Sequence, residues 1–355
     1  MNTSSGIKRA LLLLVCGSCA LSALAADAIR GRVRNQTTGR AAAGDEVILL
    51  RLQNGMEEEA RTRTDAEGGF SLPLLSADAP RILRVMHQGV NYDQSLNGTS
   101  LSGTAPLEIA VFDAVTRIRD LQGTLGIAQV ESDGAMLKVT EMYSIANDSV
   151  PPVTQSGPHN FEISIAPKAT LDSLVVKKGG GVWVNAVPVP IQGQQGRYAV
   201  DFPIRPGDTL FKYVYHLPYS GPSTVQLKLP YPIRNFAVMH PPSMSFKPSS
   251  AQAFTSPGMA QGLRVEQAVG KPVVRSVPAF EISGIGLAAQ IQPASASSAM
   301  APAAAIAPPK PATPASVTLP AAPGPLENRV WVLFSGIAAI LSAIAYAVWK
   351  RKRAV

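Results

Sequence analysis

Between residues 28 and 285 the chain consists of short apolar runs, many of which alternate with polar residues at a period of two. This period is typical of β-strands that bury one face and expose the other. The clearest examples lie at residues 161–165 and 211–217. Glycine and Asn-Gly turn signals separate the runs, and no segment shows a sustained helical period. The pattern therefore predicts an all-β fold.

The expected strands fall into two groups that divide near Arg117. The first group is expected at residues 29–33, 47–52, 59–64, 70–74, 82–86 and 107–112. The second is expected at residues 161–165, 174–176, 182–184, 198–204, 211–217, 225–229 and 280–282, with a hairpin turn at 177–181. Short strands at this spacing indicate sandwiches. We expect two tandem β-sandwich domains, over residues 26–116 and 117–286, both of ordinary domain size.

The segment after these domains has a different composition. Residues 287–328 are dominated by Ala, Pro and Ser, with too little large apolar surface to form a core, so we expect a disordered Ala/Pro-rich stalk. Residues 330–349 carry no charge and are long enough to span a bilayer. The basic residues 350–353 follow, and positive residues favour the cytoplasmic side. The sequence thus predicts a transmembrane helix at 329–349 and a cytoplasmic tail at 350–355.

The beginning of the chain predicts export. Lys8 and Arg9 precede an apolar run at residues 10–24, and Ala23-Leu24-Ala25 resembles a cleavage site, so residues 1–25 are expected to be a signal peptide. Lipidation at Cys19 is the alternative. Both cysteines lie in this segment, so the processed chain would form neither disulfides nor thiolate metal sites. The expected location is the bacterial inner membrane, single pass, with the β domains in the periplasm or outside the cell.

The net charge of +8 does not indicate nucleic-acid binding once it is located along the chain. Lys8 and Arg9 account for two positive charges and residues 350–353 for four, which leaves +2 on the part between. We therefore expect no nucleic-acid partner.

Residues 28–113 carry the pattern of a known module. Ile-Arg-Gly-Arg-Val at 29–33 is followed by a Thr-Thr-Gly turn at 37–39, the strand Val-Ile-Leu-Leu at 47–50, and Thr-Arg-Thr-Asp-Ala-Glu-Gly-Gly-Phe at 62–70. This resembles the carboxypeptidase regulatory-like family, which has a transthyretin-like (prealbumin-like) sandwich. The resemblance implies a module that is usually non-catalytic. In the motif, Asp65 is expected to accept backbone donors and Phe70 to enter the core. Residues 117–286 show only a general likeness to immunoglobulin-like envelope modules.

Few residues suggest chemistry. The four histidines lack ligand spacing, and the chain has no nucleophile elbow, P-loop or dinucleotide fingerprint, so we expect no metal and no cofactor. His87, with Tyr92 and Asp93 nearby, is a candidate for a binding loop, or alternatively a satisfied turn histidine. The charged residues 57–59 indicate a solvated hairpin, with calcium binding as the alternative.

Three tyrosines are a second candidate. Tyr213, Tyr215 and Tyr219 are able to line a surface that binds sugar or peptide, or to belong to the core, as aromatics at a period of two more often do. The leading hypothesis is a non-enzymatic envelope protein that binds or scaffolds a protein partner. The alternatives are a carbohydrate- or cell-wall-binding module, and a hydrolase that uses His87 and Asp93.

Overall fold

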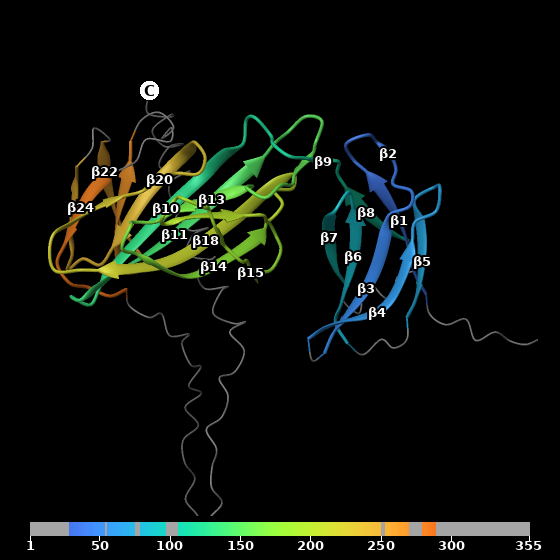
Figure 1. Cartoon of the computed structure of the whole chain (residues 1–355), viewed down its shortest axis with the longest axis horizontal. Coiled ribbons are helices and arrows are strands. Elements are labelled where there is room, and N and C mark those ends of the chain that lie inside the picture. Colours follow the sequence, from blue (N-terminus) through green and yellow to red (C-terminus); the bar gives the residue numbers. More distant parts are fainter. Residues whose placement is uncertain are drawn as a thin grey trace, which may run out of the picture. The chain divides into compact units, whose positions relative to one another are not determined.

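The computed structural model describes residues 28–53, 55–74, 79–96, 106–249, 253–269 and 279–288. Within these ranges the chain forms strands and turns and no helix, which confirms the all-β prediction. It divides between Ala114 and Val115 into two compact units, unit 1 before and unit 2 after this point (Figure 1). The predicted signal peptide, nearly all of the stalk, and the predicted transmembrane helix lie outside the described residues. No helix within the described part is long and apolar enough to cross a membrane.

Unit 1 contains two four-stranded sheets. In the first, β1 pairs antiparallel with β2 and β5 and parallel with β8; the bounds are β1 Ala28–Asn35, β2 Arg40–Ala41, β5 Gly69–Pro73 and β8 Leu107–Val111. The second has the antiparallel order β4-β3-β6-β7, with β3 Glu46–Leu52, β4 Met56–Arg63, β6 Arg81–His87 and β7 Val90–Leu96. The strands β1, β3, β4, β5, β6 and β8 carry the six segments expected in this unit, whereas β2 and β7 were not expected.

Side chains from both sheets form the core of unit 1. Along β1 every second residue is buried, as the period of two requires. Ile29 and Val33 of this series meet Leu49, Leu83 and others from the second sheet. Between them, Gly31 has no room for a side chain, because a Cβ would lie 2.5 Å from the ring of Phe70.

The turn before β5 has the geometry expected from its motif. Oδ1 of Asp65 accepts hydrogen bonds from the backbone N–H groups of Glu67 at 3.0 Å and Gly69 at 2.6 Å. Gly68 has a φ of 76°, which glycine adopts without steric cost, and its N–H donates to the carbonyl of Asp65. Phe70 then enters the core. The roles expected for the motif are therefore those that the structure shows.

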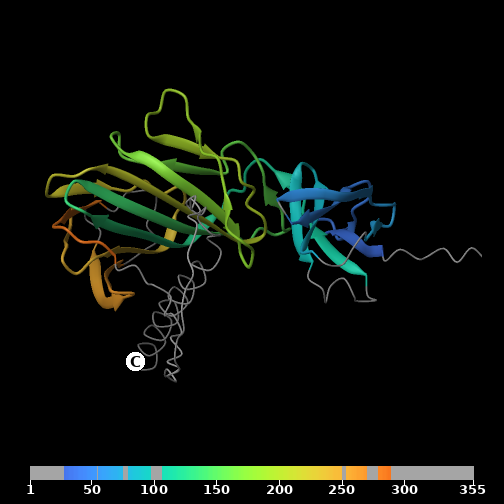
Figure 2. The same ribbon diagram turned by 90° about the horizontal axis from the view of Figure 1, so that it is seen from below.

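Unit 2 is built on an eight-stranded sheet of order β15-β14-β18-β11-β10-β20-β23-β22 (Figures 1 and 2). Only the β10–β20 pair among these is parallel. The long central strands twist together in Figure 2, as extended sheets do. The bounds are β10 Gln122–Ser132, β11 Met136–Asn147, β14 Thr170–Lys178, β15 Val184–Asn185, β18 Gly207–Pro218, β20 Ile233–His240, β22 Phe254–Ala260 and β23 Leu263–Ala268.

Two smaller sheets contribute to the same core as this large sheet. They have the orders β13-β17-β16 and β19-β24-β21, with β13 Phe161–Ser164, β16 Val189–Pro190, β17 Arg197–Val200, β19 Ser223–Gln226, β21 Ser245–Pro248 and β24 Ala279–Ser283. Phe161 of β13 stacks on Phe211 of β18 with ring centroids 3.9 Å apart. Phe280 of β24 and Val225 of β19 enter this core too. A short pair, β9 Ala114–Val115 and β12 Thr154–Gln155, completes the strands.

Candidate functional site

His87 is the last residue of β6 and is buried, whereas the sequence suggested a loop position. A two-residue turn, Gln88–Gly89, joins β6 to β7 and brings His87 opposite Val90. Both turn residues have positive φ, 47° at Gln88 and 77° at Gly89, as short hairpin turns favour. Glutamine rarely adopts this conformation, so other contacts must hold Gln88 in it.

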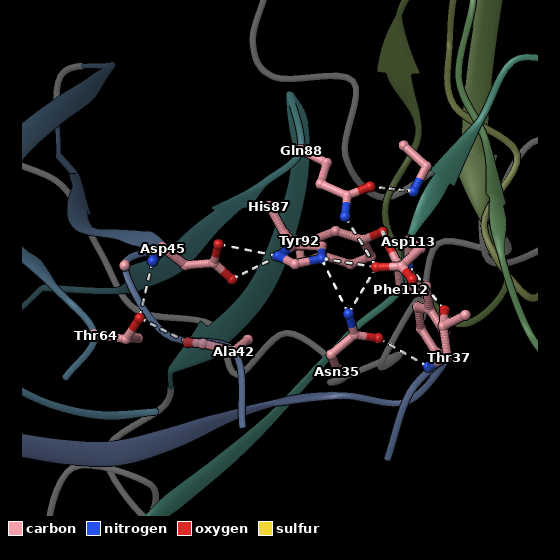
Figure 3. A network of polar contacts seen from close by, with 12 residues as sticks. Asn35, Thr37, Ala42, Asp45, Thr64, His87, Gln88, Tyr92, Phe112 and Asp113 are labelled. Carbon is pink, nitrogen blue, oxygen red and sulfur yellow. Dashed lines mark hydrogen bonds and ion pairs between the residues drawn. The ribbon is translucent and has the colours of Figure 1, made fainter. Parts of the chain in front are cut away.

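Two carboxylates bracket the imidazole of His87 (Figure 3). Nδ1 lies 2.9 and 2.8 Å from the two carboxylate oxygens of Asp45, and Nε2 lies 3.5 Å from Oδ1 of Asp113. Asp45 is itself fixed by Thr64, whose hydroxyl accepts from the Asp45 backbone N–H and donates to the carbonyl of Ala42. The backbone of Asp45 is therefore held in place just before β3.

Asp113 collects donors from three elements. Its Oδ1 accepts from Nδ2 of Asn35 at 2.7 Å and from Nε2 of Gln88 at 2.9 Å, in addition to the longer contact with His87. The other end of the Gln88 amide accepts from the backbone N–H of Ala114 at 2.8 Å. These bonds explain how Gln88 keeps its unusual backbone conformation. The whole cluster, here called the His87 network, ties β1 and the β6–β7 turn to the last residues of unit 1.

The network shifts the pKa of His87 and the pKa of Asp113. Hydrogen bonding to Asp45 raises the pKa of His87, and this effect exceeds the opposing effect of partial burial. Hydrogen bonding from Asn35, with further contributions from His87 and Gln88, lowers the pKa of Asp113. Both shifts favour the ionised forms, an imidazolium beside carboxylates. In that state Nδ1–H donates to Asp45 and Nε2–H points toward Asp113.

The other two members of the predicted loop do not act with His87. Tyr92 is buried, and its hydroxyl donates to the carbonyl of Phe112 at 2.9 Å. Asp93 forms a two-pronged ion pair with Arg84, at 2.7 and 2.8 Å. The expected pair of His87 with Asp93 is therefore wrong, because Asp93 pairs across the hairpin with Arg84, and His87 lies opposite Val90. The acidic partners of His87 come from distant positions in the sequence, which no local motif reveals.

The geometry of the network suits internal bonding better than catalysis. A histidine acting as a general base needs one ring nitrogen facing a nucleophile or substrate. Here both nitrogens of His87 face Asp45, Asp113 and the amide of Asn35. Within the described ranges no group of three or more His, Cys, Asp or Glu residues is placed to hold a metal ion.

The candidate tyrosines of unit 2 lie in its core. Tyr213, Tyr215 and Tyr219 are almost fully buried, so they offer no surface to a sugar or peptide. This corrects the binding-surface interpretation; the inward face of β18 packs against the smaller sheets, and the bulky rings fill that space. The hydroxyl of Tyr219 donates to the carbonyl of Gly284 at 3.0 Å.

These rings surround a buried carboxylate that the sequence reading overlooked. Oε2 of Glu141 accepts from the hydroxyls of Tyr143 and Tyr213, the latter at 2.8 Å. Glu141 occupies an inward position of β11, opposite Tyr213. Burial raises its pKa, and the hydrogen bonds from the tyrosines oppose that effect. The sequence did contain a sign of this buried carboxylate, because Glu141 occupies a position in β11 where the alternation would place an apolar residue. The cluster is enclosed, so its evident role is to join β11 to β18.

The acidic run at residues 57–59 is only partly a solvated hairpin. Glu57 is exposed and pairs with Arg51 at 3.2 Å. Glu59, in contrast, forms a bidentate pair with Arg81 at 2.7 and 3.2 Å, and both side chains are almost completely buried. Glu59 and Arg81 meet because β4 and β6 both pair with β3, one on each side of it.

Unit 2 exposes an apolar segment of which only residues 182–184 were expected to form a strand. Residues 182–189, here called the valine edge, include four exposed valines: Val182, Val184, Val187 and Val189, exposed by 75%, 41%, 77% and 55%. Val184 belongs to β15 and Val189 to β16, the outermost strands of two sheets, and the other two valines lie outside the strands. Beside them the ammonium groups of Lys177 and Lys212 lie 5.3 and 5.7 Å from the ring centre of Trp183.

Comparisons with known proteins leave the chain without a family. No family model matches it, and no curated protein matches it. Among solved structures, an M1 zinc metallopeptidase from Deinococcus radiodurans is similar over 46% of this chain and 42% of its own, with 13% identity and a TM-score of 0.30. A variant two-domain M1 zinc metallopeptidase bound to L-tryptophan matches over 47% and 43%, with 14% identity and a TM-score of 0.31. The chain thus spans less than half of these proteins, and likeness at this level transfers neither fold nor activity.

Proposed function

We propose that this chain is a non-catalytic, membrane-tethered protein of the bacterial envelope that binds or scaffolds a protein partner through its β units. The observation that carries the proposal is the valine edge, where four exposed valines occur within eight residues. Exposed apolar side chains that gather in one place are typical of protein interaction sites, whereas scattered ones are ordinary. The tether is the segment predicted at 329–349, and the stalk predicted at 287–328 would hold the β units away from the lipid.

In this proposal unit 1 is a carboxypeptidase regulatory-like sandwich and unit 2 an immunoglobulin-like sandwich. The Asp65 turn supports the first assignment, because its backbone bonds are those that the family motif implies. A core shared between opposing sheets supports the sandwich architecture in each unit. Such modules usually serve as accessories, which agrees with a binding role.

The non-catalytic part of the proposal draws on the His87 network. His87 is the histidine that the sequence favoured, and its ring bonds to groups that maintain unit 1. The candidate tyrosines likewise serve the core of unit 2. Both sets of residues thus have structural uses that require no substrate.

Crosslinking in intact membranes tests the proposal. The full-length chain, crosslinked and then isolated under denaturing conditions, should yield one protein partner at a fixed ratio to the chain, as quantitative mass spectrometry would measure. His87→Gln should leave this ratio unchanged. If several crosslinking chemistries recover no partner above the level of an unrelated single-pass protein, the binding function is wrong. A hydrolytic activity that disappears in His87→Gln but not in Asp93→Asn would contradict the non-catalytic assignment.

A further inference from the structure

The valine edge combines an outermost strand with backbone groups that point away from the sheet. β15 pairs with β14 through Asn185 opposite Val175 and Val184 opposite Val176, and the N–H of Ala186 donates to Leu174. In antiparallel strands the backbone groups of successive residues alternate between the two sides of the strand. Since Ala186 bonds inward, the N–H and C=O groups of Asn185 face away from β14. Such groups on an edge strand are a template for a further strand.

The side chains at this edge divide into two rows because they alternate across the sheet. One row runs from Val184 through Val176 to Phe211 and joins the apolar core. The next row runs from Asn185 through Val175 to Lys212 on the opposite face. A strand added beside β15 would therefore place apolar side chains next to the first row. Its alternate side chains would lie on the face that carries Lys212 and Trp183.

The face with Lys212 has uncompensated positive charge. Lys212 makes no ion pair with any residue of the described ranges. Burial lowers its pKa, and the nearby charge of Lys138 lowers it further. The carboxylate of Asp172, which lies on the neighbouring strand, is instead bonded to His216 at 2.7 Å. A ligand that brings a carboxylate to this face would supply the missing charge.

The hairpin next to the valine edge adds to this imbalance. Burial lowers the pKa of Lys178 at the end of β14, and the charge of Arg205 adds to the effect. The carboxylate of Asp208, close to that turn, contacts the hydroxyl of Ser144 at 3.3 Å. Two identical edges meeting would bring these lysines together, so charge disfavours a second copy of the chain as the occupant.

We propose that the valine edge is a docking site for an extended segment of a partner protein in which apolar residues alternate with Asp or Glu, added as a strand beside β15. The apolar residues continue the row of Val184, and the acidic residues lie on the face where the ammonium groups of Lys177 and Lys212 approach Trp183. Backbone bonds to Asn185 give affinity, and the alternation gives specificity. The inference rests on the proposed binding function and specifies the partner's chemistry.

A set of three synthetic peptides tests the site on the full-length chain purified in detergent. The first alternates Val with Glu over eight residues, and the second has Lys in place of Glu. The third keeps the Val–Glu sequence but carries an N-methyl group on every backbone nitrogen, so that neither of its edges can donate. The first should bind, as measured by fluorescence anisotropy of a labelled peptide. The second and third should bind at least about tenfold more weakly, because one repels the lysines and the other cannot pair its backbone.

Variants of the chain locate the binding. Asn185→Pro removes the outward N–H and should abolish binding of the Val–Glu peptide, while Lys212→Gln should weaken it several-fold. Val150→Lys changes a valine that is 94% exposed outside the valine edge and should leave binding unchanged. Circular dichroism would show that each variant keeps its strand content.

Four outcomes would overturn the inference. No binding of the Val–Glu peptide at millimolar concentration would do so, as would equal affinity for all three peptides. Concentration-dependent dimers that disappear in Asn185→Pro would identify a second copy as the occupant instead. If membrane crosslinking still recovers a stoichiometric partner that Asn185→Pro does not release, the proposed function stands and only this site is wrong.

Discussion

An edge strand of unit 1 and an edge strand of unit 2 carry side chains of opposite character. In unit 1 the outermost strand β4 carries Glu57 and Glu58, which pair with Arg51 and Arg61. In unit 2 the outermost strand β15 belongs to the valine edge and carries exposed valines. Charged side chains on an edge strand discourage pairing with another chain, whereas a bare apolar edge invites it. The β4 edge of unit 1 is therefore lined by charged pairs, whereas the β15 edge of unit 2 is lined by exposed valines.

The same contrast applies to buried charge. Unit 1 balances its buried groups with opposite charges, as in the pair of Arg81 with Glu59 and in the His87 network. Unit 2 holds its buried Glu141 with tyrosine hydroxyls and leaves Lys212 without an ion pair among the described residues. In these examples ionic pairs compensate buried charge in unit 1, whereas in unit 2 hydroxyl groups hold Glu141 and the ring of Trp183 lies beside Lys212.

The largest effect is expected where a buried charge of unit 1 loses its partner. Glu59→Leu leaves the guanidinium of Arg81 buried without its carboxylate and should reduce the free energy of unfolding of unit 1 by ~3–5 kcal/mol. The double variant Glu59→Leu/Arg81→Met should recover most of this loss, because an apolar pair leaves no buried charge. Hydrogen exchange resolved by mass spectrometry can follow unit 1 separately. If Glu59→Leu lowers the free energy of unfolding no more than the double variant does, a buried unpaired Arg81 carries no extra cost and the prediction is wrong.

A smaller effect is expected from the pH dependence of the His87 network. The pKa of His87 is raised in the folded state, so its contribution is fully present below the unfolded pKa of about 6.5. It should be lost as the pH rises through the folded pKa, at a cost of ~1.5–3 kcal/mol, the range for hydrogen bonds to charged groups. Exchange protection of unit 1 measured from about pH 6 to about pH 9 should therefore fall with rising pH.

His87→Gln provides the control for this measurement. Glutamine keeps a hydrogen-bonding group but does not titrate, so the decline in protection over this pH range should disappear. Protection of unit 2 should show no matching change. A decline of equal size in His87→Gln would mean that other groups cause the pH dependence.

The smallest effect on stability is expected at the valine edge. Val184→Lys/Val187→Lys gives unit 2 the kind of charged edge that β4 has, and because both side chains are exposed, the free energy of unfolding should change by no more than ~0.5 kcal/mol. Affinity for the Val–Glu peptide should nevertheless fall about tenfold, since the apolar row is interrupted. Chemical denaturation and anisotropy measure the two quantities. A large loss of stability would show that these valines belong to the core rather than to a binding edge.

Much of the strand pattern followed from local sequence. Alternation identified the strands around Phe161, Phe211 and Phe280, and the glycine run after Lys178 predicted the β14–β15 hairpin. The long strands β10 and β11, at the centre of the large sheet, were not predicted. In β10 both faces are largely covered and the alternation is lost; in β11 the inward Glu141 interrupts the apolar series.

The candidate site was less accessible to sequence reasoning. His87 stood out locally, yet its partners Asp45 and Asp113 come from the start of β3 and the end of unit 1. Asp93 was closer in sequence but belongs to a different cross-strand pair. Strand register decides which side chains meet, and register depends on pairings between residues far apart in the chain.

By itself the sequence determined that the chain is β structure and which residues form its sharp turns. The alternation of apolar and polar residues, the turn glycines and Asp65 each act over only a few neighbouring residues. Only the tertiary structure decided which polar groups are buried together and which apolar groups remain exposed. Burial depends on what packs over a strand, and the neighbours of a strand come from distant parts of the chain. The tyrosines of β18 and the valines of the valine edge show this: both alternate like core strands, but only the tyrosines are covered by further sheets.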